Sequence, residues 1–543
     1  MSTIEVQGGS ALAIDSAYDS STDFIVDAGG FLDIQAGGSV AGLLTIDGAV
    51  DGTHGGVVNL ESGASLLGPI AFTAPGGMLN LWGQTSPLDV TADYGFFTLN
   101  GSQAALTGQG DVIMMRSGSG NAVTLGGNAG GDADVVFGSH ASVTLLDNSI
   151  ANVFGNNNVV AAGVQVALNL SGGGNIVQAT DDTIHIGGRH ARQANGVIGS
   201  GNTISLLGTT TLNVDGDSNS VSATSGAKVN ISGANNAIHA TNDWVAVGGT
   251  GADGNATVTG DYNRVNVATN SNVALVGDNN KIRIGEGSLI SVNGSGDRLL
   301  GSGFAVSAVT GSNIWVGATG AAGATDLVSL IGGSVTIGAH ANVRLIGSND
   351  TVNVAAHANA TLIGDNLNVS ASHGANVKVG GYSPSAVADV LTGSNYTVTQ
   401  VASSNVTLAT SNAIAVMGDF ALMTVQGSGN TITAGASDTI DVTGSGNTIV
   451  LGASGLFNDT GVGSIFEVSG AVGPTTFLNF GADPQAIFDL LNGAGGFATA
   501  DDAYSALTSD GKGGVTLSLG SAGSLDFSGA SASSLSAANF KIG

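Results

Sequence analysis

A short motif, Gly-x-x-Asn-x-(Val/Ile)-x-apolar, returns through most of this 543-residue chain at an interval of 17 residues. It is clearest at residues 199–206 and 216–223. The same interval separates glycines in five runs, which are Gly138, Gly155 and Gly172; Gly199, Gly216 and Gly233; Gly260, Gly277 and Gly294; Gly347 and Gly364; and Gly427 and Gly444. A fixed period of this kind is typical of stacked coils, each of which packs mainly on its neighbours. The repeat therefore argues against a set of independent globular domains.

Each repeat contains two short segments in which apolar and polar residues alternate, for example residues 265–267 and 273–275. Alternation with period two predicts β-strands that bury one face. Stacked coils would place the inward Val, Ile, Leu and Ala side chains in columns with a spacing of about 4.8 Å. We therefore predict an all-β fold, a parallel β-solenoid (β-helix) of about 17-residue coils with a small α/β region at its C-terminus.

The pattern divides the chain into three parts. Residues 1–120 follow a looser version of the repeat and carry bulky side chains such as Phe24 and Trp82, which indicates an irregular N-terminal solenoid that is wider or capped. Residues 121–455 carry the regular coils, and residues 456–543 form a region with a different pattern.

The C-terminal region is expected to contain two short helices and a hairpin. Asp483 and Pro484 resemble the first residues of a helix that would end at Gly493. Thr499 resembles the N-cap of a second helix over residues 500–507. The hairpin is expected from residues 509–519 and 524–527.

The Asn of the repeat predicts a hydrogen-bonded ladder. A buried side-chain amide could donate to the coil on one side and accept from the coil on the other, which favours a structural role over a ligand-binding one. Asp stands at the same place at positions 297 and 350. The predicted ladder consists of Asn158, Asn175, Asn202, Asn219, Asn236, Asn263, Asn280, Asn430 and Asn447.

A longer period lies over the first. Apolar pairs run into a glycine at Gly126, Gly187, Gly248, Gly317 and Gly380, at steps of 61, 61, 69 and 63 residues. The first two steps equal three coils and ten further residues, so we expect an inserted loop after every three coils, all on one edge of the stack. Repeated loops of this kind suit an extended contact surface better than a single catalytic pocket.

The edge loops bring acidic residues together, and carboxylates in Gly-rich turns are possible ligands of Ca²⁺. No cofactor is required by this interpretation, and solvated turns are the simpler alternative. The candidate calcium ligands are Asp132, Asp134, Asp253, Asp326 and Asp389.

Composition excludes several classes of function. The chain has 12 Lys and Arg against 40 Asp and Glu, a net charge of −28, which argues against binding to nucleic acid or to an anionic membrane. It has no Cys, so disulfides and thiol catalysis are excluded. No apolar run approaches the roughly 18 residues of a membrane helix, so membrane insertion is not expected.

One loop is the best candidate for an active site. Asp181, Asp182 and His185, followed by Arg189, His190 and Arg192, carry the acid, base and cation that a β-helical polysaccharide lyase or epimerase would need. The equivalent loops lack such a set, and a solvated loop is the favoured interpretation. We therefore do not expect an enzyme.

The last 60 or so residues, in particular LTSDGKGGVTLSLGSAGSLDFSGASASSLSAANFKIG, resemble the C-terminal targeting domains of type I secretion substrates, a group that includes the repeats-in-toxin proteins. The resemblance implies export by an ABC exporter and a location outside the cell or on the bacterial surface. It agrees with an N-terminus that has no basic and apolar signal regions. The calcium nonapeptide of that family is essentially absent, with residues 248–253 as the nearest fragment, and the body of the chain resembles the Gly/Asn/Thr-rich β-solenoids of bacterial surface adhesins.

These features predict a secreted structural protein that assembles with itself into a surface layer, a filament or a biofilm matrix. The alternative is an adhesin that binds a glycan or a surface, such as cell-surface polysaccharide, through the edge loops. The first strand, with Thr3, Ile4, Glu5 and Val6, is the expected assembly contact, because an open β-solenoid edge can accept a strand from another copy.

Overall fold

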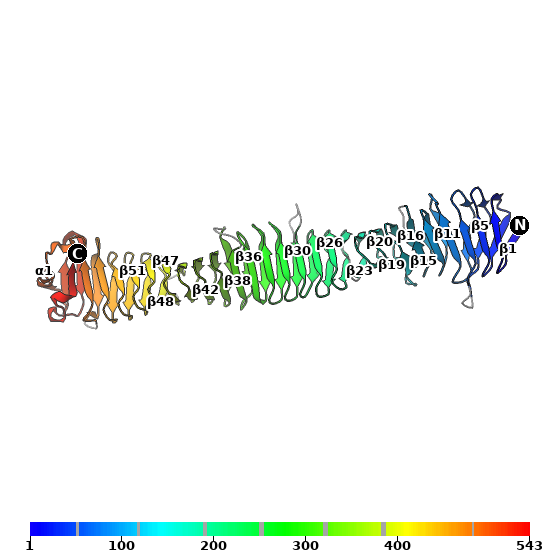
Figure 1. The fold of residues 1–543 in the computed structure, drawn as a ribbon. Helices are drawn as coiled ribbons and strands as arrows, with labels where there is room; N and C mark the ends of the chain where they lie inside the picture. The colour runs from blue at the N-terminus through cyan, green and yellow to red at the C-terminus, as the bar shows by residue number, and fades with distance from the viewer. Residues whose placement is uncertain are drawn as a thin grey trace. The chain divides into compact units, whose positions relative to one another are not determined.

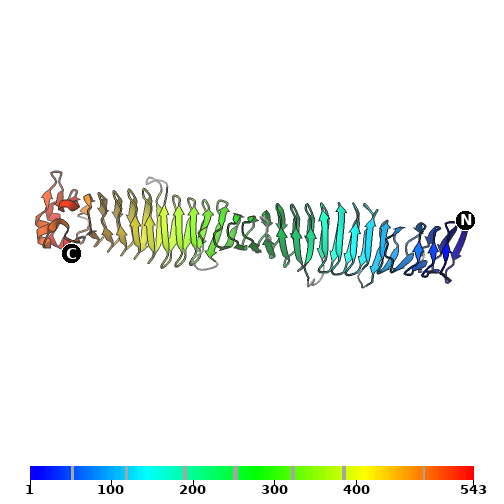
Figure 2. The same ribbon diagram turned by 90° about the horizontal axis from the view of Figure 1, so that it is seen from above.

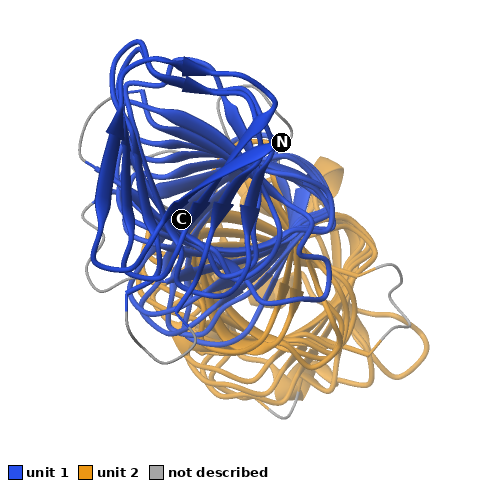
Figure 3. Cartoon of the chain, turned by 90° about the vertical axis from the view of Figure 1, so that its right-hand side faces the viewer, with its two compact units in different colours: residues 1–273 blue, residues 274–543 orange. Residues whose placement is uncertain are grey.

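The computed structural model describes residues 1–49, 54–116, 120–187, 193–248, 255–318, 324–381, 387–480 and 483–543. Its fold is the predicted parallel β-solenoid, in which strands of successive coils lie side by side (Figures 1 and 2). The chain divides into two compact units, residues 1–273 and 274–543 (Figure 3).

Unit 1 contains two long parallel sheets, A1 and B1, and one short sheet. Sheet A1 consists of β1 (Ser2–Val6), β4 (Thr22–Val26), β7 (Leu44–Ile46), β10 (Ile70–Phe72), β12 (Leu88–Thr91), β14 (Gln103–Thr107), β16 (Ala122–Gly126), β18 (Ser142–Leu145), β20 (Val159–Val164), β22 (Ile176–Thr180), β24 (Asn195–Ile198), β26 (Thr211–Asp215), β28 (Lys228–Ser232), β30 (Trp244–Val247) and β32 (Arg264–Val267). Sheet B1 consists of β2 (Ala11–Ile14), β5 (Phe31–Ile34), β8 (Val57–Leu60), β11 (Met78–Trp82), β13 (Phe96–Asn100), β15 (Val112–Met115), β17 (Asp134–Phe137), β19 (Ile150–Phe154), β21 (Ala167–Ser171), β23 (Thr183–Gly187), β25 (Thr203–Leu206), β27 (Ser220–Ala223), β29 (Asn236–His239) and β31 (Asn255–Thr259), and β33 (Asn272–Val276) begins where unit 1 ends.

The first coils of unit 1 are wider than the others. A third sheet of β3 (Ala17–Tyr18), β6 (Ser39–Val40) and β9 (Ser65–Leu66) gives them three sides. Successive partners in sheet A1 are 20 residues apart at Phe24 and Leu44 and 26 apart at Leu44 and Ile70, against 17 at Thr211 and Lys228. The extra side accommodates Phe24, which is fully buried.

Unit 2 continues the two-sheet coil and ends in a small α/β region. Sheet A2 consists of β34 (Lys281–Ile284), β36 (Ser295–Gly301), β38 (Asn313–Ala318), β40 (Ser334–Ile337), β42 (Thr351–Val354), β44 (Asn368–Ala371), β46 (Asp389–Ser394), β48 (Asn405–Ser411), β50 (Leu422–Val425), β52 (Thr439–Val442), β54 (Leu456–Asp459), β56 (Gly473–Leu478) and β60 (Gly523–Phe527), extended by β59 (Val515–Ser518) and β58 (Thr508–Ser509). Sheet B2 consists of β35 (Leu289–Asn293), β37 (Ala305–Ala308), β39 (Asp326–Ser329), β41 (Asn342–Ile346), β43 (Asn359–Ile363), β45 (Asn376–Gly380), β47 (Thr397–Gln400), β49 (Ile414–Met417), β51 (Thr431–Thr433), β53 (Thr448–Val450), β55 (Ile465–Val468), β57 (Ile487–Leu490) and β61 (Phe540–Ile542). The helical elements are α1 (Ala500–Ser505) and the 3-10 turns η2 (Ala494–Gly496), η3 (Gly520–Ala522), η4 (Ala532–Ser534) and η5 (Ala537–Asn539).

The core is built from columns of inward side chains, as the alternation predicts. Val197, Val214, Ile231 and Val247 pair in register in four successive strands of sheet A1, and each is at most 2% exposed. The side chains between them point outward, so each of these four strands has one apolar and one solvent-facing side.

The expectation that the inserted loops share one edge is wrong. Gly126 ends β16 of sheet A1, Gly187 ends β23 of sheet B1, and Gly248 follows β30 of sheet A1. In unit 2, Gly317 lies in β38 of sheet A2 and Gly380 ends β45 of sheet B2. Each 61-residue step therefore spans seven strands, or three and a half coils, and places the glycine at the end of a strand in the other sheet. The 63-residue step also spans seven strands, whereas the 69-residue step spans eight.

The C-terminal region follows the prediction in part. Helix α1 begins after Thr499, whose side chain accepts from the Asp502 amide in a capping box, and β59 pairs antiparallel with β60 as a hairpin. The predicted helix over residues 483–493 is wrong, because Ile487–Leu490 is strand β57, which pairs with β55 and β61. Its inward Phe488 and Leu490 are fully buried, and this packing outweighs the helix-end signals around it.

Candidate functional site

The repeated Asn side chain clamps its coil to the coil before it. The Asn219 Oδ1 accepts the backbone N–H of Asn202 at 3.0 Å, and its Nδ2 donates to the backbone oxygen of Gly199 at 3.0 Å. Asn236 binds Asn219 N–H at 2.9 Å and the Gly216 oxygen at 3.0 Å in the same way. One side chain thus satisfies a donor and an acceptor of a turn that the sheets leave unpaired, as buried backbone groups require.

All nine predicted ladder residues are at most 2% exposed; they are Asn158, Asn175, Asn202, Asn219, Asn236, Asn263, Asn280, Asn430 and Asn447. At eight of them, all but Asn280, the main donor and acceptor contacts both go to the preceding coil, which does not match the predicted division of one bond to each neighbouring coil. A further contact reaches the next coil at Asn202, Asn280 and Asn430, whose Nδ2 atoms lie 3.1, 3.2 and 3.1 Å from the next ladder oxygen.

The clamp residues form several rows that alternate between the two edges. In unit 1, Asn158 and Asn175 precede strands of sheet A1, Asn202 and Asn219 precede strands of sheet B1, and Asn263 again precedes a strand of sheet A1. The row therefore changes edge, as the inserted loops do.

Aspartates that the sequence analysis assigned to loops occupy the same clamp position. Asp134, Asp326 and Asp389 are 1% exposed, and an Oδ1 of each accepts a backbone N–H of the preceding coil, from Asp111, Phe304 and Leu367. The signal that was missed is the spacing Asp-x-apolar at the start of a strand, which matches the Asn-x-apolar spacing of the repeat. Further clamp aspartates are Asp111, Asp182, Asp243, Asp350 and Asp438.

The candidate calcium ligands do not converge. Asp134 points into the turn, where its Oδ2 accepts from Asn128 Nδ2 at 3.1 Å, whereas Asp132 binds the Tyr94 hydroxyl outside at 2.6 Å. Asp253 lies outside the described residues. No group of three acidic or His side chains in the described ranges is placed to hold a metal ion. Calcium binding stays a prediction.

Burial disfavours the charged form of these carboxylates. It raises the pKa of Asp111 to about 8, of Asp389 to about 7, and of Asp134 and Asp326 to about 6. Backbone N–H donors act in the opposite direction at each of them, but burial is the larger effect. Near neutral pH, Asp111 therefore keeps its proton and Asp389 titrates, whereas Asp134 and Asp326 lose their protons at a higher pH than an exposed aspartate does but are mostly ionised.

The structure does not bring the described side chains of the candidate active-site loop together. Asp182 is a clamp, with its oxygens on the amides of Val166 at 2.7 Å and Thr180 at 3.0 Å. His185 is exposed on the outer side of β23, so it does not share a site with that carboxylate. Arg189, His190 and Arg192 lie outside the described residues.

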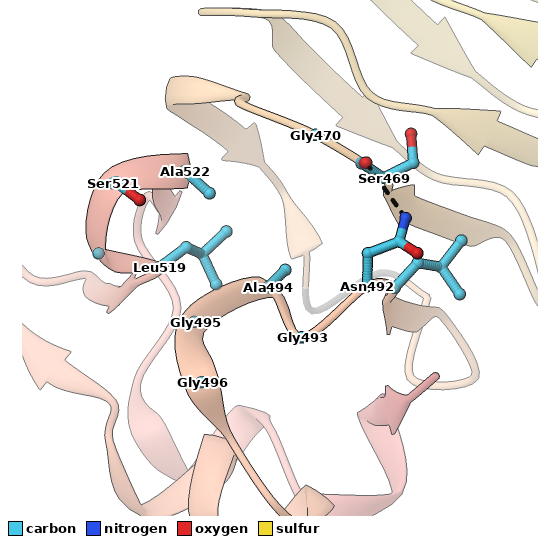
Figure 4. Close-up of a pocket in the computed structure, with 12 residues that line it drawn as sticks. Ser469, Gly470, Asn492, Gly493, Ala494, Gly495, Gly496, Leu519, Ser521 and Ala522 are labelled. Atoms are coloured by element: carbon cyan, nitrogen blue, oxygen red, sulfur yellow. Dashed lines mark hydrogen bonds between the residues drawn. The ribbon is translucent and has the colours of Figure 1, made fainter.

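A hollow of 390 Å³ lies in the C-terminal region of unit 2 (Figure 4). Its wall contains Ser469, Asn492 and Ser521, together with η2 and η3. The Asn492 Nδ2 donates to the backbone oxygen of Ser469 at 3.4 Å. The lining has no titratable side chain, so it supplies hydrogen bonds and not acid–base chemistry.

The chain matches a family model described as a protein of unknown function (DUF3060) over residues 408–461. This stretch covers regular coils of unit 2 with the clamps Asn430 and Asn447. A search of curated proteins gave no match. Within the described ranges, no helix has the length and apolar character needed to cross a membrane. The chain is a β-solenoid repeat protein.

Proposed function

We propose that this protein is an extracellular structural protein that assembles with itself into a surface layer, a filament or a biofilm matrix. The observation that carries the proposal is the use of its buried polar side chains. The side chains of clamps such as Asn219 and Asn430 use their hydrogen-bonding groups on the backbone of the preceding coil, which is the chemistry of a scaffold. The chain has a formal net charge of −28, which keeps separate copies soluble until a specific contact forms.

The first strand supports this proposal. Strand β1 pairs with β4 over its full length, and within the described ranges it pairs with no strand on its other side. A parallel edge of this kind can receive a strand from another copy. A contact between different surfaces of two copies propagates into fibres unless it closes into a ring.

Electron microscopy of the purified full-length chain tests the proposal. Filaments or a lattice are the expected result, with formation that rises with protein concentration. Single particles at every concentration would overturn the self-assembly proposal.

Export by an ABC exporter is the second part of the proposal, and it rests on the C-terminal resemblance. Strands β60 and β61 continue the two sheets of unit 2, so truncation would remove the last coil along with the signal. The sharper test keeps the chain intact and expresses it with and without a type I exporter. Protein in the medium only when the exporter is present is expected, and equal release without it would contradict the assignment.

A further inference from the structure

Each of the three tryptophans of the chain has an arginine over its ring. The guanidinium carbon lies 5.2 Å from the ring centroid for Arg116 and Trp82, 5.3 Å for Arg264 and Trp244, and 4.1 Å for Arg298 and Trp315. Stacking on an aromatic ring holds the planar guanidinium in a fixed orientation, which reduces the entropy it loses when it binds an anion.

Two glycines lie against the indole of the tightest stack, which is that of Arg298 on Trp315. A β-carbon on Gly317 would come within 2.0 Å of the Trp315 ring, and one on Gly338 within 2.6 Å. The indole therefore lies against the sheet because neither residue has a side chain. Arg298 pairs directly with Trp315 in the neighbouring strand, so the stack is fixed by strand register.

Two of the stacks belong to rows of positive charge on the outer faces of the sheets. In unit 1, Lys228, Trp244 and Arg264 occupy equivalent positions in β28, β30 and β32. In unit 2, Lys281, Arg298 and Trp315 do so in β34, β36 and β38, and Arg283 is exposed beside Lys281. Each row thus places two cations and one indole on successive coils, at steps of about 4.8 Å.

Among the residues that the structure describes, the cations in these rows form no ion pair with a carboxylate. Lys228, Arg264, Lys281, Arg283 and Arg298 are exposed, and the ion pair of the described residues is the one between Lys541 and Asp489. They stand out on a chain that has only 12 Lys and Arg residues. An arrangement that keeps them together and unpaired favours an external anion.

We propose that the outer faces of β28–β30–β32 and of β34–β36–β38 bind a linear polysaccharide that carries carboxylate groups. The guanidinium fork matches a carboxylate in two parallel hydrogen bonds, and the exposed part of the indole offers an apolar surface to a sugar ring. The regular step along each row suits a chain of acidic sugars better than a single ion. A nucleic acid is disfavoured, because its closely spaced phosphates need more cations than the rows supply on so acidic a protein.

This proposal goes beyond self-assembly and does not rest on it, since a single copy contains both rows. The test is calorimetric titration of the full-length chain with polygalacturonate at low salt. The double variant Arg264→Gln/Arg298→Gln should bind about tenfold more weakly or worse for the loss of two charged contacts.

A matched control is available on the other face. Arg344 and Lys378 are exposed in β41 and β45 of sheet B2 and have no tryptophan beside them. The variant Arg344→Gln/Lys378→Gln removes the same charge, and its affinity should fall by no more than about twofold through long-range electrostatics. Circular dichroism confirms that both variants fold.

Three results would overturn the proposal. Equal losses in the two variants would mean that net charge alone governs binding. Equal affinity for poly-dT would mean that the rows bind polyanions in general. Self-association that disappears only in the Arg264→Gln/Arg298→Gln variant, together with no polygalacturonate binding in the wild type, would identify the carboxylates of a second copy as the occupant.

Discussion

The difference between Asn and Asp at the clamp position is the main chemical choice in this fold. Asn has one acceptor and one donor, which match the N–H and the C=O of the turn. Asp has two acceptors: at Asp350, Oδ1 accepts the Gly333 amide at 2.9 Å while Oδ2 is buried without a hydrogen-bond partner. Asp182 and Asp243 solve the problem differently, because their Oδ2 atoms accept an amide of their own turn. At Asp350, burial raises the pKa of the carboxyl group above its usual value, which favours the protonated form, in which the carboxyl group is a donor.

The clamp predicts a large cost for removing a single Asn. In Asn219→Ala, the Asn202 amide and the Gly199 oxygen lose their partners inside the turn, and we expect the free energy of unfolding to fall by about 2 kcal/mol. Urea unfolding of the variant and the wild type measures this change in the free energy of unfolding. The control is Asn230→Ala, which removes an exposed bond to Asn213 and should cost less than about 0.5 kcal/mol. Equal losses would show that the clamp is no stronger than a surface amide pair.

The buried carboxyl groups predict stability that falls as the pH rises. Because burial raises the folded-state pKa of Asp111 to about 8, the folded state holds its proton more tightly than the unfolded state. Its contribution is complete below the unfolded pKa of about 4 and is lost as the pH rises towards about 8. Asp111→Asn should remove this part of the dependence, so the urea midpoint should change less between about pH 5 and about pH 9 in the variant than in the wild type. An unchanged dependence would mean that Asp111 is ionised in the folded protein.

At the scale of single elements, sequence alternation predicted strands well because each strand buries one face. The prediction failed at residues 483–493. There Asp483 and Gly493 resemble the two ends of a helix, and we gave these signals more weight than the alternation that places Phe488 and Leu490 on one side of a strand. It also failed to assign Asp134, Asp326 and Asp389, since an Asp in a Gly-rich stretch reads as a solvated turn. The burial of these carboxylates depends on the neighbouring coil, which no local pattern reports.

The last coils of unit 2 replace aliphatic columns with aromatic packing, and this predicts a local effect of mutation. Phe477 lies 4.9 Å from Phe466, 5.0 Å from Phe488, 5.2 Å from Phe457 and 5.5 Å from Phe527, measured between ring centroids. Phe477→Ala should cost about 3–5 kcal/mol, because it opens a cavity among these rings.

Hydrogen exchange is the measurement for this variant. Since each coil contacts only its neighbours, the amides of β54–β57 should lose protection while those of β40–β43 keep it. The control is Phe420→Ala, because Phe420 is 63% exposed, and its removal should leave exchange unchanged. Uniform loss of protection over unit 2 would contradict the local picture.

At the scale of the molecule, the 17-residue period was enough to predict the solenoid, and the bulky side chains near the N-terminus indicated its wider start. The alternation of loops and clamps between edges was not predicted. The spacing of two glycines in the sequence gives the number of residues between them but not the number of strands. A step that includes half a coil moves the insertion to the other edge of the solenoid and leaves the sequence motif unchanged. The boundaries at residues 120 and 455 stay predictions.

The proposed assembly contact at β1 predicts opposite results from neighbouring proline substitutions. The Ser2 amide donates to the Ser21 oxygen at 2.8 Å and the Val6 oxygen accepts from Asp27 at 3.0 Å, so even-numbered residues of β1 face β4. Thr3 and Glu5 therefore present their backbone groups to the other edge. Thr3→Pro should abolish assembly in electron micrographs and leave the fold intact, because proline is tolerated on the solvent side of an edge strand.

Ile4→Pro is the comparison. It removes an amide that faces β4, so it should loosen the first coil and lower its protection from hydrogen exchange. Assembly that survives Thr3→Pro would place the contact on another surface and exclude Thr3, Ile4, Glu5 and Val6 as the joint.

The clamps also make the two ends of a partly folded stack of coils unequal as sites for adding the next coil. Clamp side chains such as Asn219 and Asn430 reach back towards the N-terminus. A half-formed stack that lacks its later coils therefore ends in turn amides that the backbone holds rigidly and that only water can pair. A stack that lacks its earlier coils ends instead in Asn side chains, which rotate freely and stay hydrated until a partner arrives. Such an end is the better template, because it adapts to each incoming segment before closing on it. A chain delivered to the outside with its C-terminus leading would meet that favourable end at every step of folding.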